Sequence, residues 1–227
     1  MTREIIDTGD GSHSIAIPGM QVTYHSRHGA IQESMHVFIE AALRYTTGDV
    51  HIFETGFGTG LNALLTLIDA EQQSRNIFYE TIEPFPLTIA EAAQLNYCNV
   101  LQRTDLQPLF EQLHTCAWET PVAITPRFIV KKRRLSLPDL STDQPINQST
   151  DQPINIVYFD AFAPSVQPEL WTTTVFASLY QRMAANGILT TYSSKADVRR
   201  AMESAGFSIQ KIPGPWGKRE MIRAKRN

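Results

Sequence analysis

Cysteine is scarce in this sequence, which has only Cys98 and Cys116 among its 227 residues. The two form no CxxC pair and are too few for a disulfide-rich secreted scaffold. We therefore expect both to be reduced and to lie in the core or in helices.

Long apolar runs are also lacking. No stretch approaches the roughly 20 residues that a helix needs to span a bilayer. The first residues, Met-Thr-Arg-Glu-Ile, do not lead into the apolar segment of a signal peptide. The sequence therefore predicts a cytoplasmic protein without a membrane partner.

A strong charge of one sign is lacking as well. The formal net charge is −3, so the composition as a whole does not indicate a nucleic-acid-binding protein. From Lys195 onward, however, basic residues clearly outnumber acidic ones, and we expect a basic face there. The chain is long enough for one α/β domain with a full core.

Glycine is concentrated in one stretch, Glu54-Thr-Gly56-Phe-Gly58-Thr-Gly60-Leu-Asn62. The apolar run 50–53 precedes it and a helix-like stretch, 61–70, follows it, which predicts a strand, a turn and a helix. Glycine lets the backbone approach a ligand closely, and a helix N-terminus offers unpaired N–H groups. The stretch is thus typical of a nucleotide-type pocket, although a tight turn without a ligand is the alternative.

The spacing of these glycines is E-x-G-x-G-x-G, which differs from the G-x-G-x-x-G dinucleotide fingerprint. This difference argues against a nicotinamide-dependent oxidoreductase. The spacing is similar to the first motif of S-adenosylmethionine-dependent methyltransferases.

Short apolar segments within residues 4–24 are separated by glycine and proline, which predicts a β hairpin with an extra strand. A dense polar cluster follows, from Tyr24 to His36, and leads into a helix. This cluster could line a cofactor pocket. The alternative is the start of a helix with solvated histidines at His25, His28 and His36, and we expect no metal site.

Two later strands end in an acid. Glu83 follows the strand-like run 77–82 and stands 23 positions after Gly60, close to the offset of about 20 residues at which a Rossmann-type acid meets ribose hydroxyls. An acid that merely faces water is the alternative. Asp160 follows the continuous apolar run 154–159, which predicts a strand buried on both faces with its end in the crevice of a parallel sheet.

Two features have uncertain roles. Four adjacent cations, Lys131 to Arg134, indicate either a phosphate contact or a charged, solvated sheet edge. Residues 141–156 contain an eight-residue tandem duplication, Ser-Thr-Asp-Gln-Pro-Ile-Asn-Gln followed by a near copy, which predicts a surface loop.

The remaining pattern predicts further helices and strands. The expected helices are 87–95, 105–118, a helix after Pro168-Glu-Leu-Trp171 that runs to about residue 185, and 195–205. The expected strands are 128–130, 188–192, 207–212 and 221–224.

Taken in order, several motifs resemble the methyltransferase domain of the bacterial MnmC family, which modifies the wobble uridine of tRNA. The resemblance covers roughly residues 20–224. It is carried by residues 54–62, Glu83-Pro-Phe-Pro-Leu87, Asp160-Ala-Phe-Ala-Pro164, Pro168-Glu-Leu-Trp171, Val198-Arg-Arg200, Ala205-Gly-Phe207 and Gly217-Lys-Arg-Glu-Met221.

The resemblance implies an α/β, Rossmann-like methyltransferase fold with a mostly parallel sheet and an antiparallel C-terminal strand. We predict a β extension over residues 1–30 and this domain over residues 31–227. It also implies methyl transfer from S-adenosylmethionine to the amine of 5-aminomethyl-2-thiouridine in the tRNA anticodon loop. The fused family members carry a flavin-dependent oxidoreductase domain, for which this chain is too short, so we expect a separate enzyme to supply the amine.

Roles for individual residues follow from the resemblance and the motifs. Asp160 is expected beside the amine, where a carboxylate could accept its proton or orient it. The expected cofactor-binding residues are Gly29, Glu33, Glu54, Gly56, Gly58, Gly60, Asn62 and Glu83. The expected substrate-binding residues are Phe162, Tyr192, Lys195, Trp216, Lys218 and Arg219, whereas Trp171 is expected in the core.

Two points depart from the family pattern. Lys131 to Arg134 stand where the family has an acid for adenine, which leaves the adenine contact unassigned, and the duplicated loop is longer than the family connection. Two other functions stay open at this stage. One is a methyltransferase for a small-molecule amine, and the other is a non-catalytic RNA-binding module.

Overall fold

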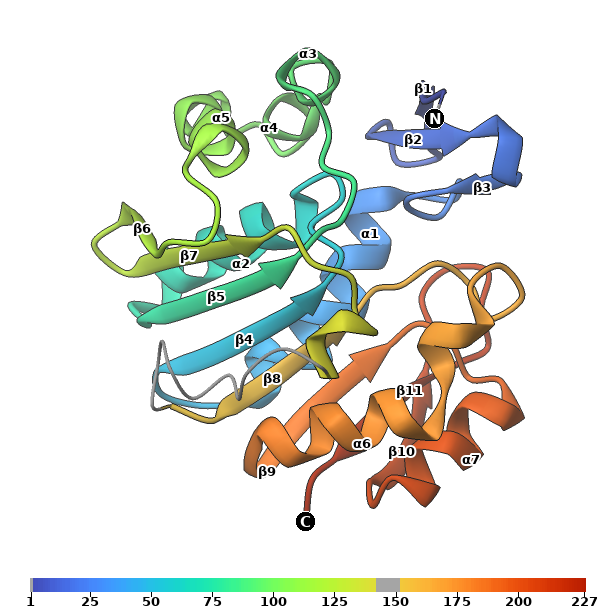
Figure 1. Ribbon diagram of the computed structural model, residues 1–227. Coiled ribbons are helices and arrows are strands. Elements are labelled where there is room, and N and C mark those ends of the chain that lie inside the picture. The colour runs from blue at the N-terminus through green and yellow to red at the C-terminus, as the bar shows by residue number, and fades with distance from the viewer. Residues whose placement is uncertain (1, 142–151) are drawn as a thin grey trace.

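The computed structural model describes residues 2–141 and 152–227 and contains one large sheet with helices on both faces (Figure 1). The order of its eight strands is β10-β11-β9-β8-β4-β5-β7-β6. The five central strands β9, β8, β4, β5 and β7 are parallel, whereas β6, β10 and β11 join by antiparallel pairing. The strands are β4 Val50–Thr55, β5 Ile77–Ile82, β6 Val122–Thr125, β7 Phe128–Arg133, β8 Ile154–Phe159, β9 Met183–Thr191, β10 Ser208–Pro213 and β11 Glu220–Lys225.

This arrangement confirms the predicted Rossmann-like methyltransferase fold with an antiparallel C-terminal strand. The central strands β4 and β8 are buried on both faces, and for β8 the nearly continuous apolar sequence predicted this. The 154–159 strand therefore ends, with Asp160, at the same edge of the sheet as the glycine turn that follows β4.

Helices cover the two faces of the sheet and form two hydrophobic cores. On one face α2 and α5 pack with η2, and on the other α6 packs with α7 (Figure 1). The helical segments along the chain are α1 Ala30–Ser34, η2 Met35–Glu40, η3 Leu43–Tyr45, α2 Leu61–Gln73, α3 Ile89–Ala92, α4 Tyr97–Val100, η4 Thr104–Leu106, α5 Gln107–Thr115, η5 Asp139–Ser141, η7 Pro168–Trp171, α6 Thr173–Arg182 and α7 Ala196–Ser204.

Several predicted boundaries were wrong. The helix expected to reach residue 185 ends at Arg182, and β9 begins at Met183. Asn186, with φ of +64°, and Gly187 therefore lie inside a strand, where the pairing with β8 shifts register between Ile154 and Ile156. The Asn-Gly signal marks an irregularity of the strand rather than a helix end.

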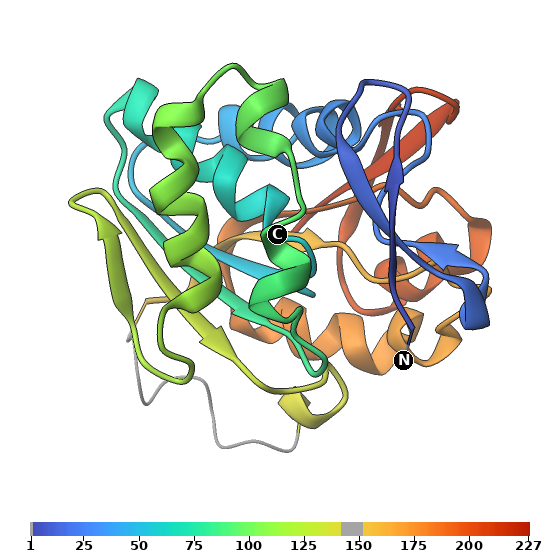
Figure 2. The same ribbon diagram turned by 90° about the horizontal axis from the view of Figure 1, so that it is seen from above.

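The N-terminal residues form a separate three-stranded antiparallel sheet of β1 Glu4–Asp7, β2 His13–Ile17 and β3 Val22–Thr23, with the short helix η1 Pro18–Met20 between β2 and β3. It lies to one side of the large sheet in both views (Figures 1 and 2). The turn after β1 carries Asp10, whose carboxylate accepts a hydrogen bond from the backbone N–H of Gln32 at 3.0 Å. Asp10 thereby caps the start of α1 from outside the helix.

This cap explains why residue 29 is a glycine. A Cβ at Gly29 would lie 2.7 Å from Oδ2 of Asp10, so a side chain there would push the capping carboxylate away. The hydrogen bonds from Ser12, Gln32 and Thr8 outweigh the effect of burial and hold the pKa of Asp10 below its usual value.

The run Lys131 to Arg134 was expected to make a phosphate contact or to form a solvated sheet edge. Both interpretations were wrong for Lys131 and Lys132. Lys131 and Lys132 are buried within β7. Nζ of Lys132 donates hydrogen bonds to the carbonyl oxygens of Leu113 and His114, at 2.7 and 2.8 Å. These carbonyls belong to the last turn of α5, where backbone acceptors lack partners within the helix and a cation is favourable.

Three further features are the cysteines, the duplicated loop and the lack of certain clusters and helices among the described residues. Cys98 is buried and Cys116 half-buried, and both are free thiols. Residues 142–151, which include most of the duplicated loop, lie outside the described residues. Within residues 2–141 and 152–227, no cluster of three or more His, Cys, Asp or Glu side chains is suited to a metal ion, and no helix is long and apolar enough to cross a membrane.

Replacing Lys132 by methionine keeps the length and apolar stem of the side chain but leaves the carbonyls of Leu113 and His114 without their donor. Buried polar groups left unpaired cost about 1–3 kcal/mol, so we expect the free energy of unfolding to fall by that amount in urea denaturation. Lys225→Met, on an exposed position of β11, is the control and should change it by less than about 0.5 kcal/mol. Equal effects of the two substitutions would contradict a role for the Lys132 ammonium.

Candidate cofactor and acceptor site

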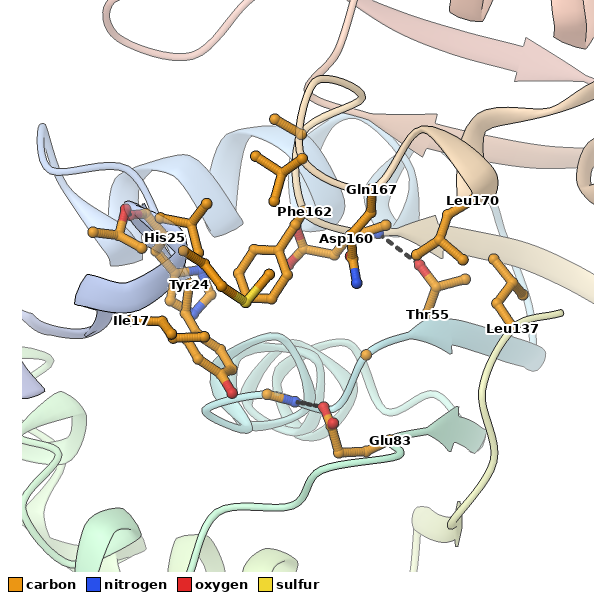
Figure 3. Close-up of a pocket in the computed structure, with 18 of the residues that line it drawn as sticks. Ile17, Tyr24, His25, Thr55, Glu83, Leu137, Asp160, Phe162, Gln167 and Leu170 are labelled. Carbon is orange, nitrogen blue, oxygen red and sulfur yellow. Dashed lines mark hydrogen bonds between the residues drawn. The ribbon is translucent and has the colours of Figure 1, made fainter. Parts of the chain in front are cut away.

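A cavity of about 830 Å³ opens at the carboxyl ends of β4, β5 and β8. One wall comes from the glycine turn after β4 and another from residues 160–170 after β8. The N-terminal sheet supplies a third wall, from Ile17 to Ser26 (Figure 3). Parallel strands end together at one edge of a sheet, and the cavity lies where ligands bind in such folds.

The glycine turn is built by three residues in left-handed conformations. Gly56, Gly58 and Gly60 have φ angles of +88°, +51° and +72°, which favour glycine over residues with a Cβ. Gly56 and Gly58 line the cavity, whereas Gly60 lies behind it and starts α2. A Cβ at Gly60 would lie 2.9 Å from Nε2 of His114, so this glycine serves packing.

Glu83 and Tyr24 lie on the same side of the glycine turn. The Glu83 carboxylate accepts hydrogen bonds from the backbone N–H of Gly58 at 3.0 Å and of Phe85 at 2.8 Å. Burial raises the pKa of Glu83, and burial together with the Glu83 charge raises the pKa of Tyr24. Figure 3 shows Tyr24 and Glu83 reaching towards the same part of the cavity. The Tyr24 ring also contacts Phe162 edge-on, with centroids 5.4 Å apart.

Asp160 lies on the other side of the cavity, where Asn62 links it to Glu54. Nδ2 of Asn62 donates to Oδ2 of Asp160 at 2.8 Å and to Oε1 of Glu54 at 3.0 Å. The backbone N–H of Asp160 donates to Oγ1 of Thr55 at 2.9 Å (Figure 3). The Asp160 carboxyl group, at the end of β8, is thus held in place by the last residues of β4 and the first turn of α2.

Glu54 and Asp160, the two carboxyl groups that Asn62 links, both have raised pKa values. Burial raises the pKa of Glu54 to about 8, and the charge of Asp160 adds to the effect, so Glu54 is mainly protonated at neutral pH. Burial, followed by the charge of Glu33, raises the pKa of Asp160 to about 7. Asp160 can therefore both hold and release a proton near neutral pH, which suits a general base or acid.

A third group of residues lies next to Asp160. Lys218, from the loop between β10 and β11, contacts Glu33 of α1, with Nζ 2.9 Å from Oε1. The same Nζ lies 3.8 Å from the centroid of the Tyr192 ring. Glu33, Tyr192 and Lys218 all line the cavity.

The structure brings some of the sequence-predicted residues into the cavity and leaves others outside it. Those lining the cavity are Glu33, Gly56, Gly58, Asn62, Glu83, Asp160, Phe162, Tyr192 and Lys218. Those outside it are Gly29, Glu54, Gly60, Lys195, Trp216 and Arg219. Trp216 is 77% exposed, whereas Trp171 is buried as expected, with Nε1 donating to the carbonyl oxygen of Phe162 at 2.9 Å.

Sequence reasoning missed several cavity residues. Ser136, Leu137 and Pro138 line the cavity just after β7, the place where the family pattern has an acid. Tyr24 and His25 were not missed, because they belong to the polar cluster that could line a cofactor pocket, and both line the cavity. His25 is buried rather than solvated and contacts Oγ1 of Thr59 through Nε2 at 2.7 Å.

Gly58→Val should abolish binding of S-adenosylmethionine, the cofactor that the sequence resemblance implies. A Cβ at Gly58 would lie 3.0 Å from the Tyr24 ring, so a branched side chain would fill the space between the glycine turn and the N-terminal sheet. Calorimetric titration measures the effect. Gly48→Val is the matched control, because Gly48 also has a left-handed φ, +74°, but no neighbour within 4 Å of its Cβ position. Equal cofactor affinity in the two folded variants would mean that the turn is only structural.

Comparisons with known proteins identify the family and the fold of this chain. A family model described as S-adenosyl-L-methionine-dependent methyltransferase matches residues 107–227, which is more than half of the chain. The crystal structure of MNMC2 from Aquifex aeolicus has the same fold, with a TM-score of 0.76 and 24% identity over 100% of this chain and 70% of that one.

Two curated relatives carry the name tRNA 5-methylaminomethyl-2-thiouridine biosynthesis bifunctional protein MnmC. The protein from Aeromonas hydrophila is 31% identical over 220 residues, which cover 89% of this chain and 32% of the relative. The protein from Aromatoleum aromaticum is 32% identical, and the match covers 96% of this chain and 34% of the relative. The chain thus spans about a third of the length of these relatives. It belongs to a family of S-adenosyl-L-methionine-dependent methyltransferases, with S-adenosylmethionine as cofactor, and along its length it is homologous to one part of the MnmC proteins.

Proposed function

We propose that this protein methylates the aminomethyl group of 5-aminomethyl-2-thiouridine at the wobble position of tRNA. The name of the curated relatives, which refers to 5-methylaminomethyl-2-thiouridine biosynthesis in tRNA, supports the choice of substrate. The observation that carries the proposed chemistry is the Asp160 carboxyl, which lines the cavity and has a pKa raised to about 7.

The cavity fits the cofactor on one side. Gly56 and Gly58 line it without a Cβ, and Oδ1 of Asn62 is buried with no partner among the described residues, so that it can accept a hydrogen bond from a ligand. Glu83 presents a carboxylate for hydroxyl groups of a ribose. We assign these four residues to the cofactor, which supplies a methyl group on a positively charged sulfur.

Asp160 is assigned to the amine. A primary amine is mostly protonated at neutral pH, and its lone pair becomes available for attack only when a proton leaves. Asp160 can accept that proton, because its pKa lies near neutrality and Asn62 holds one of its oxygens in place. Orientation of the amine against the methyl group contributes a further part of the rate.

The outer residues of the C-terminal segment are assigned to the tRNA. Lys195 and Arg219 are exposed and basic, and Trp216 offers an exposed ring to a base. Bases of a single-stranded loop can be splayed out and stacked on aromatic side chains. Phe162 lies inside the cavity, where it could contact the uridine that carries the amine.

The second candidate is a methyltransferase for a small-molecule amine. The cavity favours it, because 830 Å³ is within the usual range of small-molecule pockets, about 300–1,000 Å³. Incubation with methyl-labelled S-adenosylmethionine and tRNA that bears or lacks the aminomethyl group distinguishes the two. We expect label only in the tRNA with the aminomethyl group. Label in free alkylamines but in neither tRNA would favour the second candidate.

Asp160→Asn should lower the single-turnover rate of methyl transfer by about 10²- to 10⁴-fold, because an amide cannot accept the proton. Cofactor affinity should stay near that of the wild type, since Asn62 can still hydrogen-bond to the amide oxygen. Asp7→Asn, at an exposed residue of β1, is the control. Loss of cofactor binding in Asp160→Asn would instead assign Asp160 to the cofactor.

The pH dependence provides an independent check. The raised pKa of Asp160, about 7, means that the carboxyl is protonated below this pH and cannot accept a proton from the amine. The single-turnover rate should therefore fall about tenfold per pH unit below pH 7. This dependence on Asp160 should disappear in Asp160→Asn. The amine's own loss of a proton gives an acidic limb with a midpoint well above pH 7, so a midpoint near pH 7 in both proteins would contradict the role of Asp160.

A further inference from the structure

Lys218 occupies a place that suits an alkylammonium ion. Its Nζ lies 2.9 Å from Oε1 of Glu33 and 3.8 Å from the centroid of the Tyr192 ring. A carboxylate and the face of an aromatic ring are the two kinds of group that attract an ammonium head. Both of these groups line the same cavity as Asp160.

Glu33 and Tyr192, which surround the Lys218 ammonium, are held by hydrogen bonds that do not involve Lys218. Oε2 of Glu33 accepts a hydrogen bond from the backbone N–H of Ser26 at 2.8 Å. The Tyr192 hydroxyl donates to the carbonyl oxygen of Ala161 at 2.9 Å. Glu33 has only 11% of its side chain exposed. The carboxylate and the ring would therefore keep their positions if the Lys218 side chain moved away.

Lys218 is held less firmly than Glu33 and Tyr192. Its side chain is 36% exposed, and Glu33 is the one hydrogen-bond acceptor that its ammonium contacts among the described residues. A lysine side chain has several rotatable bonds and a strongly hydrated head, so it can turn out into solvent at moderate cost. A competing cation could therefore replace it.

The charges in the cavity favour a cation at this place. Glu33 and Asp160 are close enough that the charge of Glu33 raises the pKa of Asp160, after burial, whereas the charge of Lys218 lowers it. Two carboxylates in a partly desolvated cavity repel each other unless a positive charge lies near both. In the free protein, Lys218 supplies this positive charge.

We propose that Glu33 and Tyr192 form the binding site for the ammonium group of the methyl acceptor, and that Lys218 fills this site in the free protein until the acceptor displaces it. The proposal rests on the proposed function for the identity of the acceptor as a primary amine. It changes two expectations from the sequence, in which Glu33 served the cofactor and Lys218 the tRNA.

Methylammonium chloride is the probe that tests the site without methyl transfer. Its dissociation constant is measured by NMR titration of the protein at constant ionic strength, with sodium chloride as the balancing salt. Lys218→Ala should bind methylammonium about tenfold more tightly than the wild type, because a tethered group competes at an effective concentration in the millimolar range.

Lys211→Ala is the matched control. Nζ of Lys211 also contacts a carboxylate, Oε2 of Glu220 at 2.8 Å, but outside the cavity. This variant should bind methylammonium as weakly as the wild type. In the Lys218→Ala background, Glu33→Gln and Tyr192→Leu should each remove the gain, since the first removes the charge and the second the ring. A Lys218→Ala protein that binds no better than Lys211→Ala, or binding that survives Glu33→Gln, would overturn the proposal.

A second measurement serves if Lys218→Ala fails to fold. In the wild type, the methylene protons of Lys218 next to the Tyr192 ring should have shifted NMR signals. These signals should move towards free-lysine values on addition of methylammonium but not of sodium, and no movement would refute the displacement. The protein could bind methylammonium in a way that depends on Glu33 and yet fail to methylate aminomethyl-tRNA. That result would refute the proposed function but support the ammonium site.

Discussion

The hydrogen bonds of the Asn62 side chain fix the geometry on which the rest of the site depends. One amide nitrogen joins Glu54 at the end of β4 to Asp160 at the end of β8, from the first turn of α2. The fold brings these three residues together, because parallel neighbouring strands and the helix after the glycine turn meet at one edge of the sheet. A buried amide that donates to two carboxyl groups is favourable when one of them is protonated, which agrees with the raised pKa of Glu54.

The small N-terminal sheet completes the cavity from outside the Rossmann-like domain. It is attached to the domain through the Asp10 cap of α1 and brings Tyr24 over the glycine turn, close to Glu83. With this sheet, the glycine turn becomes one wall of a cavity of about 830 Å³ that stays partly open to solvent. Partial exclusion of water by this wall strengthens electrostatic interactions with bound groups.

Lysine ammonium groups reach fixed acceptor oxygens in several parts of the structure, two of them buried in β7 and one half-exposed in the cavity. Lys132 supplies donors to the carbonyl oxygens at the end of α5, and Lys131 lies 3.8 Å from the buried carboxylate of Glu80. Lys218 does the same for Glu33 in the cavity. In each case the flexible apolar stem of lysine packs in the protein while its head reaches a fixed oxygen atom.

The sequence by itself determined the elements whose signals are local. The glycine turn, the strand that ends before Glu83 and the buried strand before Asp160 could all be predicted, because each depends on backbone conformation or periodicity within a few residues. The mostly parallel sheet was implied by the family resemblance. Only the tertiary structure decided which charged side chains would lie inside. Lys131 and Lys132 form part of a basic run, yet they are buried in β7. Lys218 meets Glu33 across 185 positions of sequence, and no local pattern encodes a contact made by the packing of two distant segments.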